Sequence, residues 1–178
     1  TGLYSGISAT DWSWAPLWMD FDNDGLKDLF ISNGIPKRLN DMDYINFIYN
    51  NEIQQKIQNN DVKDKDMALI KKFPEIKIPN KFYINKDNLQ FEDKEAAVGN
   101  DQPTYSNGAV YADFDNDGDK DLMVGVLGML FPNNDKIGSV VILENDGRFN
   151  FTKHLIVEKI ARVSDVRAGD LDNDGDMD

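Results

Sequence analysis

The sequence contains no cysteine and only one histidine, His154. Without cysteine, disulfides cannot stabilise the fold, and cysteine content gives no indication of the cellular compartment. With this one histidine, we expect a histidine-based catalytic triad or a zinc site to need residues from outside this sequence. We expect His154 to be a surface side chain on a strand over residues 151–157.

Positive charge and long apolar runs are also scarce. Lys and Arg number 19 against 32 Asp and Glu, which gives a formal net charge of −13. Because this charge repels phosphate and no basic patch is present, we expect no nucleic-acid partner. The longest apolar run, residues 122–132, is too short to span a bilayer, so we expect no transmembrane segment. The chain begins without a signal peptide, which a fragment of a longer secreted protein would have lost.

Common catalytic motifs are missing as well. The sequence has no Gly-x-Ser-x-Gly elbow, no phosphate-binding loop and no dinucleotide-binding fingerprint. Acidic residues are plentiful, but 14 of the 32 lie inside three repeated segments. Nothing among the remaining acids singles out a general acid of the kind that glycoside hydrolysis requires. We therefore expect no enzyme activity.

The repeated segment is a nine-residue motif, Asp-x-Asp-x-Asp-Gly-x-x-Asp, which occupies residues 20–28, 113–121 and 170–178. Carboxylates at positions 1, 3 and 5 can converge from one tight turn, and glycine at position 6 accepts a positive φ. Position 7 can offer its backbone carbonyl, so its side chain is expected to be free to vary. Clustered carboxylates repel one another unless a cation lies between them, and calcium is the hard ion that suits irregular oxygen sites. The alternative is an acidic, metal-free turn, which three matching copies disfavour.

The motif does not predict an EF-hand. An EF-hand needs glutamate at position 12 and a helix on each side of the loop. Position 12 is Ile31 in the first copy and Val124 in the second. The flanking sequence indicates strands instead, over 14–19 and 28–32 around the first loop and over 108–112 and 121–125 around the second. The loops are therefore expected to join one strand to the next.

Two further hairpins complete a repeating unit. Residues 82–91 and 140–149 each indicate a strand, a polar turn and a strand, in an alignment that pairs Ile84 with Ile142 and Phe91 with Phe149. Once an insertion is removed from the first unit, each unit spans about 57 residues with four strands, close to one β-propeller blade. The predicted fold class is all-β, with about two and a half blades of a larger propeller.

The predicted blades have the following boundaries. The first covers residues 1–105, the second covers residues 106–162, and the truncated start of a third covers residues 163–178. A ring usually needs at least about four blades, so we expect the remainder of the propeller to lie in a longer parent chain.

The insertion in the first unit lies at about residues 34–80 and changes to a helical period. Its apolar residues recur on one helical face, at Ile45, Ile48, Tyr49, Ile53 and Ile57. A second short helix is expected to begin at Asp61 and to end at Pro74. It would run through Met67, Leu69, Ile70 and Phe73. The insertion is interpreted either as a functional excursion or as a hairpin that covers a sheet edge.

Trp12, Trp14 and Trp18 share the parity of one strand and are expected to point to one face. If these rings are exposed, they form a platform on which a sugar can stack. If they are covered, they pack one blade against the next. The sequence leaves both interpretations open.

These loops resemble those of the FG-GAP/VCBS repeat family, in which a Phe-Asp-Asn-Asp-Gly calcium loop lies in each propeller blade. Residues 9–25 look similar to the ASPIC/UnbV-associated branch, common in secreted bacterial proteins, and the repeats of the integrin α-subunit head are also alike. The resemblance implies structural calcium sites away from the ligand-binding face. The metal ligands that it implies are Asp20, Asp22, Asp24, Leu26, Asp28, Asp113, Asp115, Asp117, Asp119, Asp121, Asp170, Asp172, Asp174, Asp176 and Asp178, with Leu26, Asp119 and Asp176 contributing carbonyls.

The sequence therefore predicts a calcium-binding module with about three Ca²⁺ ions and a binding or adhesion role toward a protein or glycan. An extracellular or cell-surface location is expected, because extracellular calcium modules bind at about 10⁻⁴–10⁻³ M. Two alternatives stay open. One is part of a polysaccharide-degrading propeller enzyme, and the other is an architectural subunit of a surface assembly.

Overall fold

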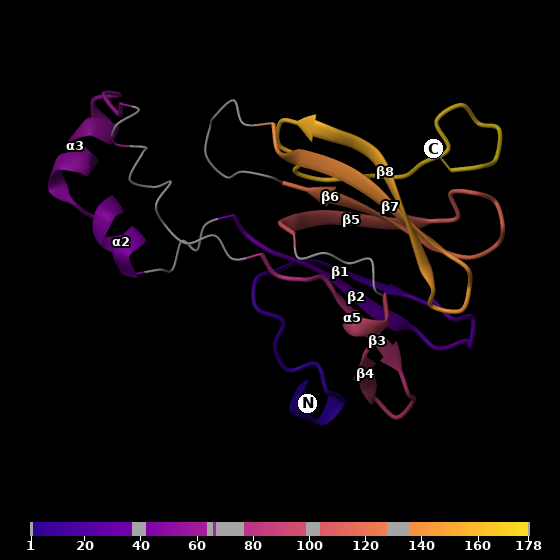
Figure 1. Cartoon of the computed structure of the whole chain (residues 1–178). Coiled ribbons are helices and arrows are strands. Elements are labelled where there is room, and N and C mark those ends of the chain that lie inside the picture. Colours follow the sequence, from indigo (N-terminus) through magenta and orange to yellow (C-terminus); the bar gives the residue numbers. More distant parts are fainter. Residues whose placement is uncertain are drawn as a thin grey trace. The chain divides into compact units, whose positions relative to one another are not determined.

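The computed structural model describes residues 2–36, 42–63, 66, 77–98, 104–127 and 136–177. The chain divides into two compact units, one of Thr1–Ile35 with Lys77–Asp178 and the other of Pro36–Ile76. Within its described residues, the larger unit contains eight strands in two four-stranded sheets and few, short helices (Figure 1). The predicted all-β class, as partial propeller blades, is confirmed.

Each sheet is an antiparallel meander in which consecutive strands are neighbours. The first sheet is formed by β1 (Ser13–Met19), β2 (Asp28–Asn33), β3 (Lys81–Asn85) and β4 (Phe91–Asp93). The second is formed by β5 (Ser106–Ala112), β6 (Asp121–Val126), β7 (Gly138–Asn145) and β8 (Phe151–Ile160). Four-stranded meanders of this kind are the building blocks of propellers.

The core lies between the two sheets. Phe21, Phe30 and Phe82 of the first sheet and its loop are fully buried, and they belong to one cluster with residues of the second sheet. Phe82 and Phe151 have ring centroids 5.4 Å apart, and Phe21 meets Phe149 edge-on at 5.5 Å. Burial of one such ring stabilises the fold by about 1.5–3 kcal/mol, so this aromatic cluster is a major link between the sheets.

The structure corrects the alignment of the two hairpins by two residues. Asn85 and Asn145 occupy equivalent positions, because each donates its backbone N–H to the last aspartate of the preceding acidic loop. Ile84 therefore corresponds to Glu144 and not to Ile142. Phe149 lies in the β7–β8 turn with φ of 65°, and β8 begins at Phe151. The sequence alignment failed because it matched Phe149, which lies in the turn, with Phe91, which begins β4, and strand periodicity does not reveal the positive φ of Phe149.

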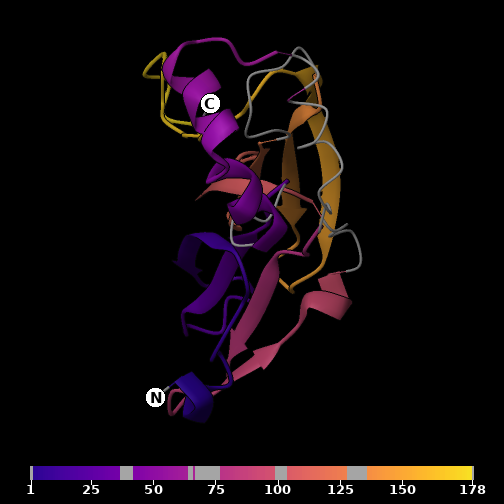
Figure 2. The ribbon, with the colours of Figure 1, turned by 90° about the vertical axis from the view of Figure 1, so that its left-hand side faces the viewer.

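The smaller unit contains helices in its described residues, as predicted, but the predicted helical face is divided between α2 (Met42–Ile48) and α3 (Asn51–Gln58) (Figure 2). The division lies at Asn50, whose side chain caps α3 by accepting the N–H of Glu52 at 2.9 Å. The predicted start of the second helix at Asp61 is wrong, because residues 61–63 are not helical. The predicted course of that helix through residues 67–73 lies outside the described residues. No helix in the described part of the chain is long and apolar enough to cross a membrane.

The two strand tryptophans lie on the outward face of β1. Trp14 and Trp18 are 43% and 48% exposed, while Trp12 precedes the strand and is half-buried. The Trp14 indole donates to the carbonyl of Gly34 at 2.7 Å, and Trp18 packs edge-on against Phe91 at 5.7 Å. Two short helices, α1 (Gly2–Ser5) and α5 (Glu95–Val98), complete the larger unit.

Candidate metal centre

All three acidic loops adopt the same turn in the larger unit, at the right-hand side of Figure 1. In each loop the glycine at position 6 donates its N–H to the aspartate at position 1, with distances of 2.9, 3.0 and 3.1 Å. The residue at position 7 donates to the aspartate at position 5, at 2.7, 2.8 and 3.2 Å. The predicted positive φ at position 6 is present at Gly25, Gly118 and Gly175. The turn is therefore a local property of the nine residues.

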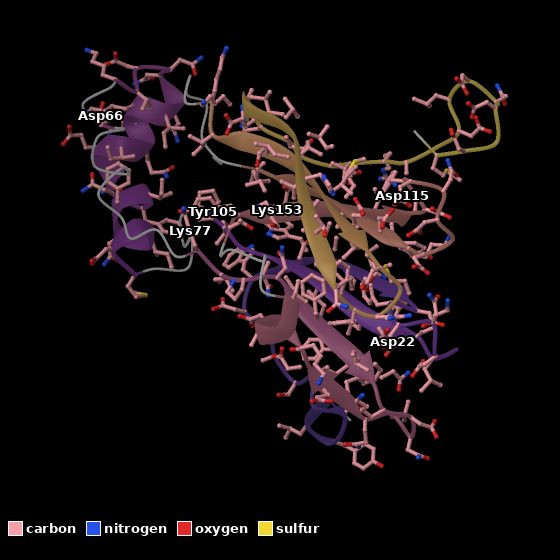
Figure 3. The ribbon with its side chains drawn as sticks, turned by 45° about the vertical axis from the view of Figure 1, so that its right-hand side comes forward. Asp22, Asp66, Lys77, Tyr105, Asp115 and Lys153 are labelled. Carbon is pink, nitrogen blue, oxygen red and sulfur yellow. The ribbon has the colours of Figure 1, made fainter. Side chains whose placement is uncertain are left out.

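The turn brings three carboxylates of each loop together. Each group offers oxygen atoms that lie within 4.8 Å of one another. The groups are Asp20, Asp22 and Asp28; Asp113, Asp115 and Asp121; and Asp170, Asp172 and Asp174. Figure 3 shows Asp22 and Asp115 on the first and second loops. Each of these aspartate clusters can bind a metal ion.

The remaining predicted ligands stand apart from these groups. Asp24 and Asp117 are not among the clustered carboxylates, and their side chains accept the N–H groups of Leu26 and Asp119. Asp178 lies outside the described residues. The carbonyls proposed for Leu26, Asp119 and Asp176 stay predictions.

Two buried oxygen atoms test whether a cation fits. Oδ1 of Asp22 in the first loop and Oδ1 of Asp113 in the second are buried and accept no hydrogen bond from the described residues. A buried carboxylate oxygen without a donor is costly, because it has lost water and gained nothing in exchange. A cation between the clustered carboxylates would supply the missing interaction at both places. The donor set, made only of oxygen, suits a hard divalent ion.

The last aspartate of the first two loops is buried and has a second task. Asp28 accepts the N–H of Phe21 at 2.9 Å and that of Asn85 at 2.8 Å. Asp121 does the same in the second sheet, with Phe114 and Asn145. Each aspartate thereby ties its loop to the end of the third strand of its sheet, β3 in the first and β7 in the second.

Burial raises the pKa of the Asp28 carboxyl. The two backbone hydrogen bonds lower this pKa, and the charges of Asp22 and Asp24 raise it again. Burial likewise raises the pKa of Asp121, with the same pattern of opposing contributions. In the absence of a cation, the ionised form of each carboxylate is therefore disfavoured, and a bound cation would reverse this preference.

Sequence reasoning missed the asparagines that link one loop to the next. Asn23, at position 4 of the first loop, donates to Oδ1 of Asp119 in the second loop at 2.7 Å. Asn116, at position 4 of the second loop, donates to Asp176 in the third at 3.3 Å. The expectation that the position-7 side chain is free to vary is therefore wrong for the second and third loops. There the side chains of Asp119 and Asp176 accept these bonds. The signal was present, since asparagine stands at position 4 in all three copies.

His154 lies on β8 and is half exposed, as expected from the sequence. Its Nε2 atom lies 2.6 Å from a carboxylate oxygen of Glu144. It is not among the clustered groups of the described residues that could hold a metal ion.

A comparison with protein families found that residues 127–178 match the model of an FG-GAP-like repeat. The matched stretch covers β7, β8 and the third acidic loop. Repeats of this kind are typical of propeller-like interaction modules. A search among curated proteins found no match to the chain. The narrower resemblance to the ASPIC/UnbV-associated branch stays a prediction.

Proposed function

Because the chain carries an FG-GAP-like repeat, we propose that it is a calcium-stabilised segment of a β-propeller that serves as an extracellular binding module. The observation that carries the proposal is the acidic cluster in each loop, together with the donor-free buried oxygens of Asp22 and Asp113. Asp20, Asp22 and Asp28 would hold one ion, and their equivalents in the other loops would hold two more. The ion would supply positive charge and nothing catalytic.

Calcium is favoured over magnesium by the construction of the loops. Magnesium demands a near-octahedral shell and gives up its water reluctantly, whereas calcium tolerates irregular shells of carboxylates and carbonyls. The first two loops present carboxylates from a single turn plus one buried aspartate at the start of the next strand. Such a set of carboxylates is the kind of irregular shell that calcium accepts more readily.

The ions would contribute substantially to stability. If the dissociation constant of each loop were about 10⁻⁴ M and free calcium were about 1 mM, linkage would add about 1.4 kcal/mol per site. Domains of this size are stable by only about 5–15 kcal/mol, so three such sites would supply a large share of the stability of the segment. This argument also favours a location where calcium is abundant, which is outside the cell.

The test is a calcium titration by isothermal calorimetry on the full chain. We expect three equivalents of bound Ca²⁺, and we expect magnesium at the same concentration to produce no comparable heat. Asp22→Asn, Asp115→Asn and Asp172→Asn should each remove one equivalent. Asp61→Asn is the matched control, because Asp61 is an exposed aspartate of the smaller unit, outside the loops. An unchanged stoichiometry in the three loop variants would contradict the assignment.

The affinity tests the proposed location. Dissociation constants of about 10⁻⁴–10⁻³ M match extracellular modules, while values near 10⁻⁸ M match cytosolic buffers. The binding role is supported by the repeat and by the two exposed tryptophans on β1, Trp14 and Trp18. Binding to a panel of glycans in the presence of calcium, and its loss in Trp18→Ala, would establish a sugar ligand. Absence of binding throughout the panel would direct attention to protein ligands.

A further inference from the structure

We infer that the first two calcium loops bind their ions cooperatively, because a series of hydrogen bonds through Asn145 and the backbone of Phe21 connects Asp121 of the second loop to Asp28 of the first. This inference rests on the proposed function, since it concerns the ions that the loops would hold. It assigns a positioning role to two asparagines, Asn145 and Asn23. Between the second and third loops, the described residues show only the surface bond from Asn116 to Asp176.

The first connection is a buried path through the backbone of Phe21. Asp121 of the second loop accepts the N–H of Asn145 at 2.9 Å, and the Asn145 amide donates to the carbonyl of Phe21 at 2.8 Å. The N–H of Phe21 then donates to Asp28 of the first loop at 2.9 Å. Asp28, Asp121 and Phe21 are all fully buried, and Asn145 is 1% exposed. The path therefore runs from one acidic cluster to the other without passing through solvent.

This path holds the peptide unit that connects Phe21 to Asp22. Asp20 and Asp22, on either side of Phe21, belong to the acidic cluster of the first loop. An ion in the second loop would fix Asp121 and with it Asn145, so the backbone of the first loop would already be ordered when its own ion arrives. When the first loop then binds its own ion, the protein loses less conformational entropy than it would without the earlier ion. This smaller entropy loss gives positive cooperativity.

The second connection lies at the loop surface. Asn23 donates to Asp119 at 2.7 Å, and Gly147 of the β7–β8 turn packs directly against this pair. A Cβ atom at Gly147 would lie 2.5 Å from Oδ2 of Asp119 and 2.7 Å from Nδ2 of Asn23. Gly147 has φ of 68°, which glycine adopts without strain. Its missing side chain also leaves room for Asn23 and Asp119. Three segments thus meet at one contact between the loops.

The second and third loops share only the outer part of this arrangement. Asn116 reaches Asp176 at 3.3 Å, which is longer and weaker than the 2.7 Å bond between the first two loops. Phe114 is only partly buried, whereas Phe21 is fully buried. Within the described residues, the third loop therefore provides an internal reference for weak coupling.

Electrostatics alone predicts the opposite sign of coupling. A bound dication in the second loop makes that loop less negative, so its field at the first loop becomes less attractive for calcium. Disabling the second loop should then strengthen calcium binding at the first loop. Coupling through the hydrogen bonds predicts weaker binding instead. The direction of the change therefore distinguishes the two.

The experiment follows the backbone amides of Gly25, Gly118 and Gly175 by NMR during a calcium titration of the full chain. Each amide donates to the first aspartate of its own loop and so reports that loop separately. With the second loop disabled by Asp115→Asn, we expect calcium affinity at Gly25 to fall at least about fivefold. Disabling the first loop by Asp22→Asn should weaken binding at Gly118 by the same factor, because coupling between binding sites is reciprocal.

Two glycine variants isolate the surface bond. Asn23→Gly removes the side chain, and glycine accepts the positive φ of 56° at this position without strain. It should reduce the coupling between the first two loops. Asn173→Gly is the matched control, with φ of 63° at the same position of the third loop, and it should leave that coupling unchanged. A dispersed NMR spectrum of each variant confirms that it is folded.

The outcomes separate this inference from the proposed function. If calcium binds at all three glycines but Gly25 affinity is unchanged or higher in Asp115→Asn, the inference is wrong and the proposed function stands. If none of the three amides responds to calcium, the proposed function falls and the inference falls with it. Coupling that persists undiminished in Asn23→Gly would overturn the role of the Asn23–Asp119 bond.

Discussion

The first and third acidic loops share a sequence motif but differ in their surroundings. Both form the same turn, with the position-6 glycine donating to the position-1 aspartate at 2.9 and 3.1 Å. At position 2, however, Phe21 of the first loop is fully buried, whereas Leu171 of the third is 81% exposed. The difference shows that nine residues specify the turn, while the adjoining hairpin and sheet decide whether the loop becomes part of a core.

The largest expected effect comes from deleting the buried ring at position 2. Phe21→Ala should destabilise the fold by about 3–5 kcal/mol, because Phe21 packs against Phe82, Phe149 and Phe151. The equivalent change in the exposed loop, Leu171→Ala, should stay within about 0.5 kcal/mol. Urea unfolding in the presence of calcium measures both. Equal effects of the two substitutions would show that the loops do not differ as described.

A smaller effect is expected at the contact between the first two loops. Gly147→Ala should cost about 1–2 kcal/mol, because alanine is strained at positive φ and its Cβ would collide with Asn23 and Asp119. Gly169→Ala, just before the third loop, should be close to neutral, because its Cβ would meet no atom within 4 Å. The same urea experiment compares the two. A neutral Gly147→Ala would mean that the Asn23–Asp119 pair has room to move.

The smallest effect concerns pH. In the calcium-free chain, burial raises the pKa of Asp28 and Asp121, so the folded state binds their protons more readily than the unfolded state does. Lowering the pH from 7 through these raised pKa values should therefore stabilise the calcium-free chain. Protons also compete with calcium for the same carboxylates, so the stability that calcium adds should shrink over this pH range.

The third loop sharpens this pH prediction. Hydrogen bonding, first of all from the backbone N–H of Asp176, lowers the pKa of Asp174, so protons compete less well there. Calcium affinity at Gly25 and Gly118 should begin to fall at a higher pH than at Gly175. NMR titrations at pH 7, 6 and 5 measure the order of these losses. The reverse order would contradict the burial assigned to the first two loops.

Much of the fold could be predicted because its signals are local. Strand alternation, the acidic turn and its glycine all depend on neighbouring residues, and they indicated the strands on both sides of Asp20–Asp28 and Asp113–Asp121 correctly. The hairpin register could not be predicted, because Phe149 and Leu89 adopt positive φ inside turns that resemble strand ends. The division of the insertion into α2 and α3 depends on the Asn50 cap, which helical periodicity alone does not reveal.

The candidate site was predictable in composition but not in its connections. Clustered aspartates identify the loops directly. Asn23 is 96 positions from its partner Asp119 in the sequence. Asn145 is 124 positions from its partner Phe21. Such contacts depend on how the two sheets pack. No local pattern specifies that packing, so they could be found only in the structure.

The most direct test of the central claim is a thermal melt of the chain in excess EGTA and in about 1 mM calcium, with magnesium as the control ion. Three sites that each add about 1.4 kcal/mol should raise the melting temperature by about 10 °C in calcium. Magnesium should leave the melting temperature close to its value in EGTA. Equal melting temperatures in calcium and in EGTA would contradict the account, because the acidic loops would then contribute no calcium-dependent stability.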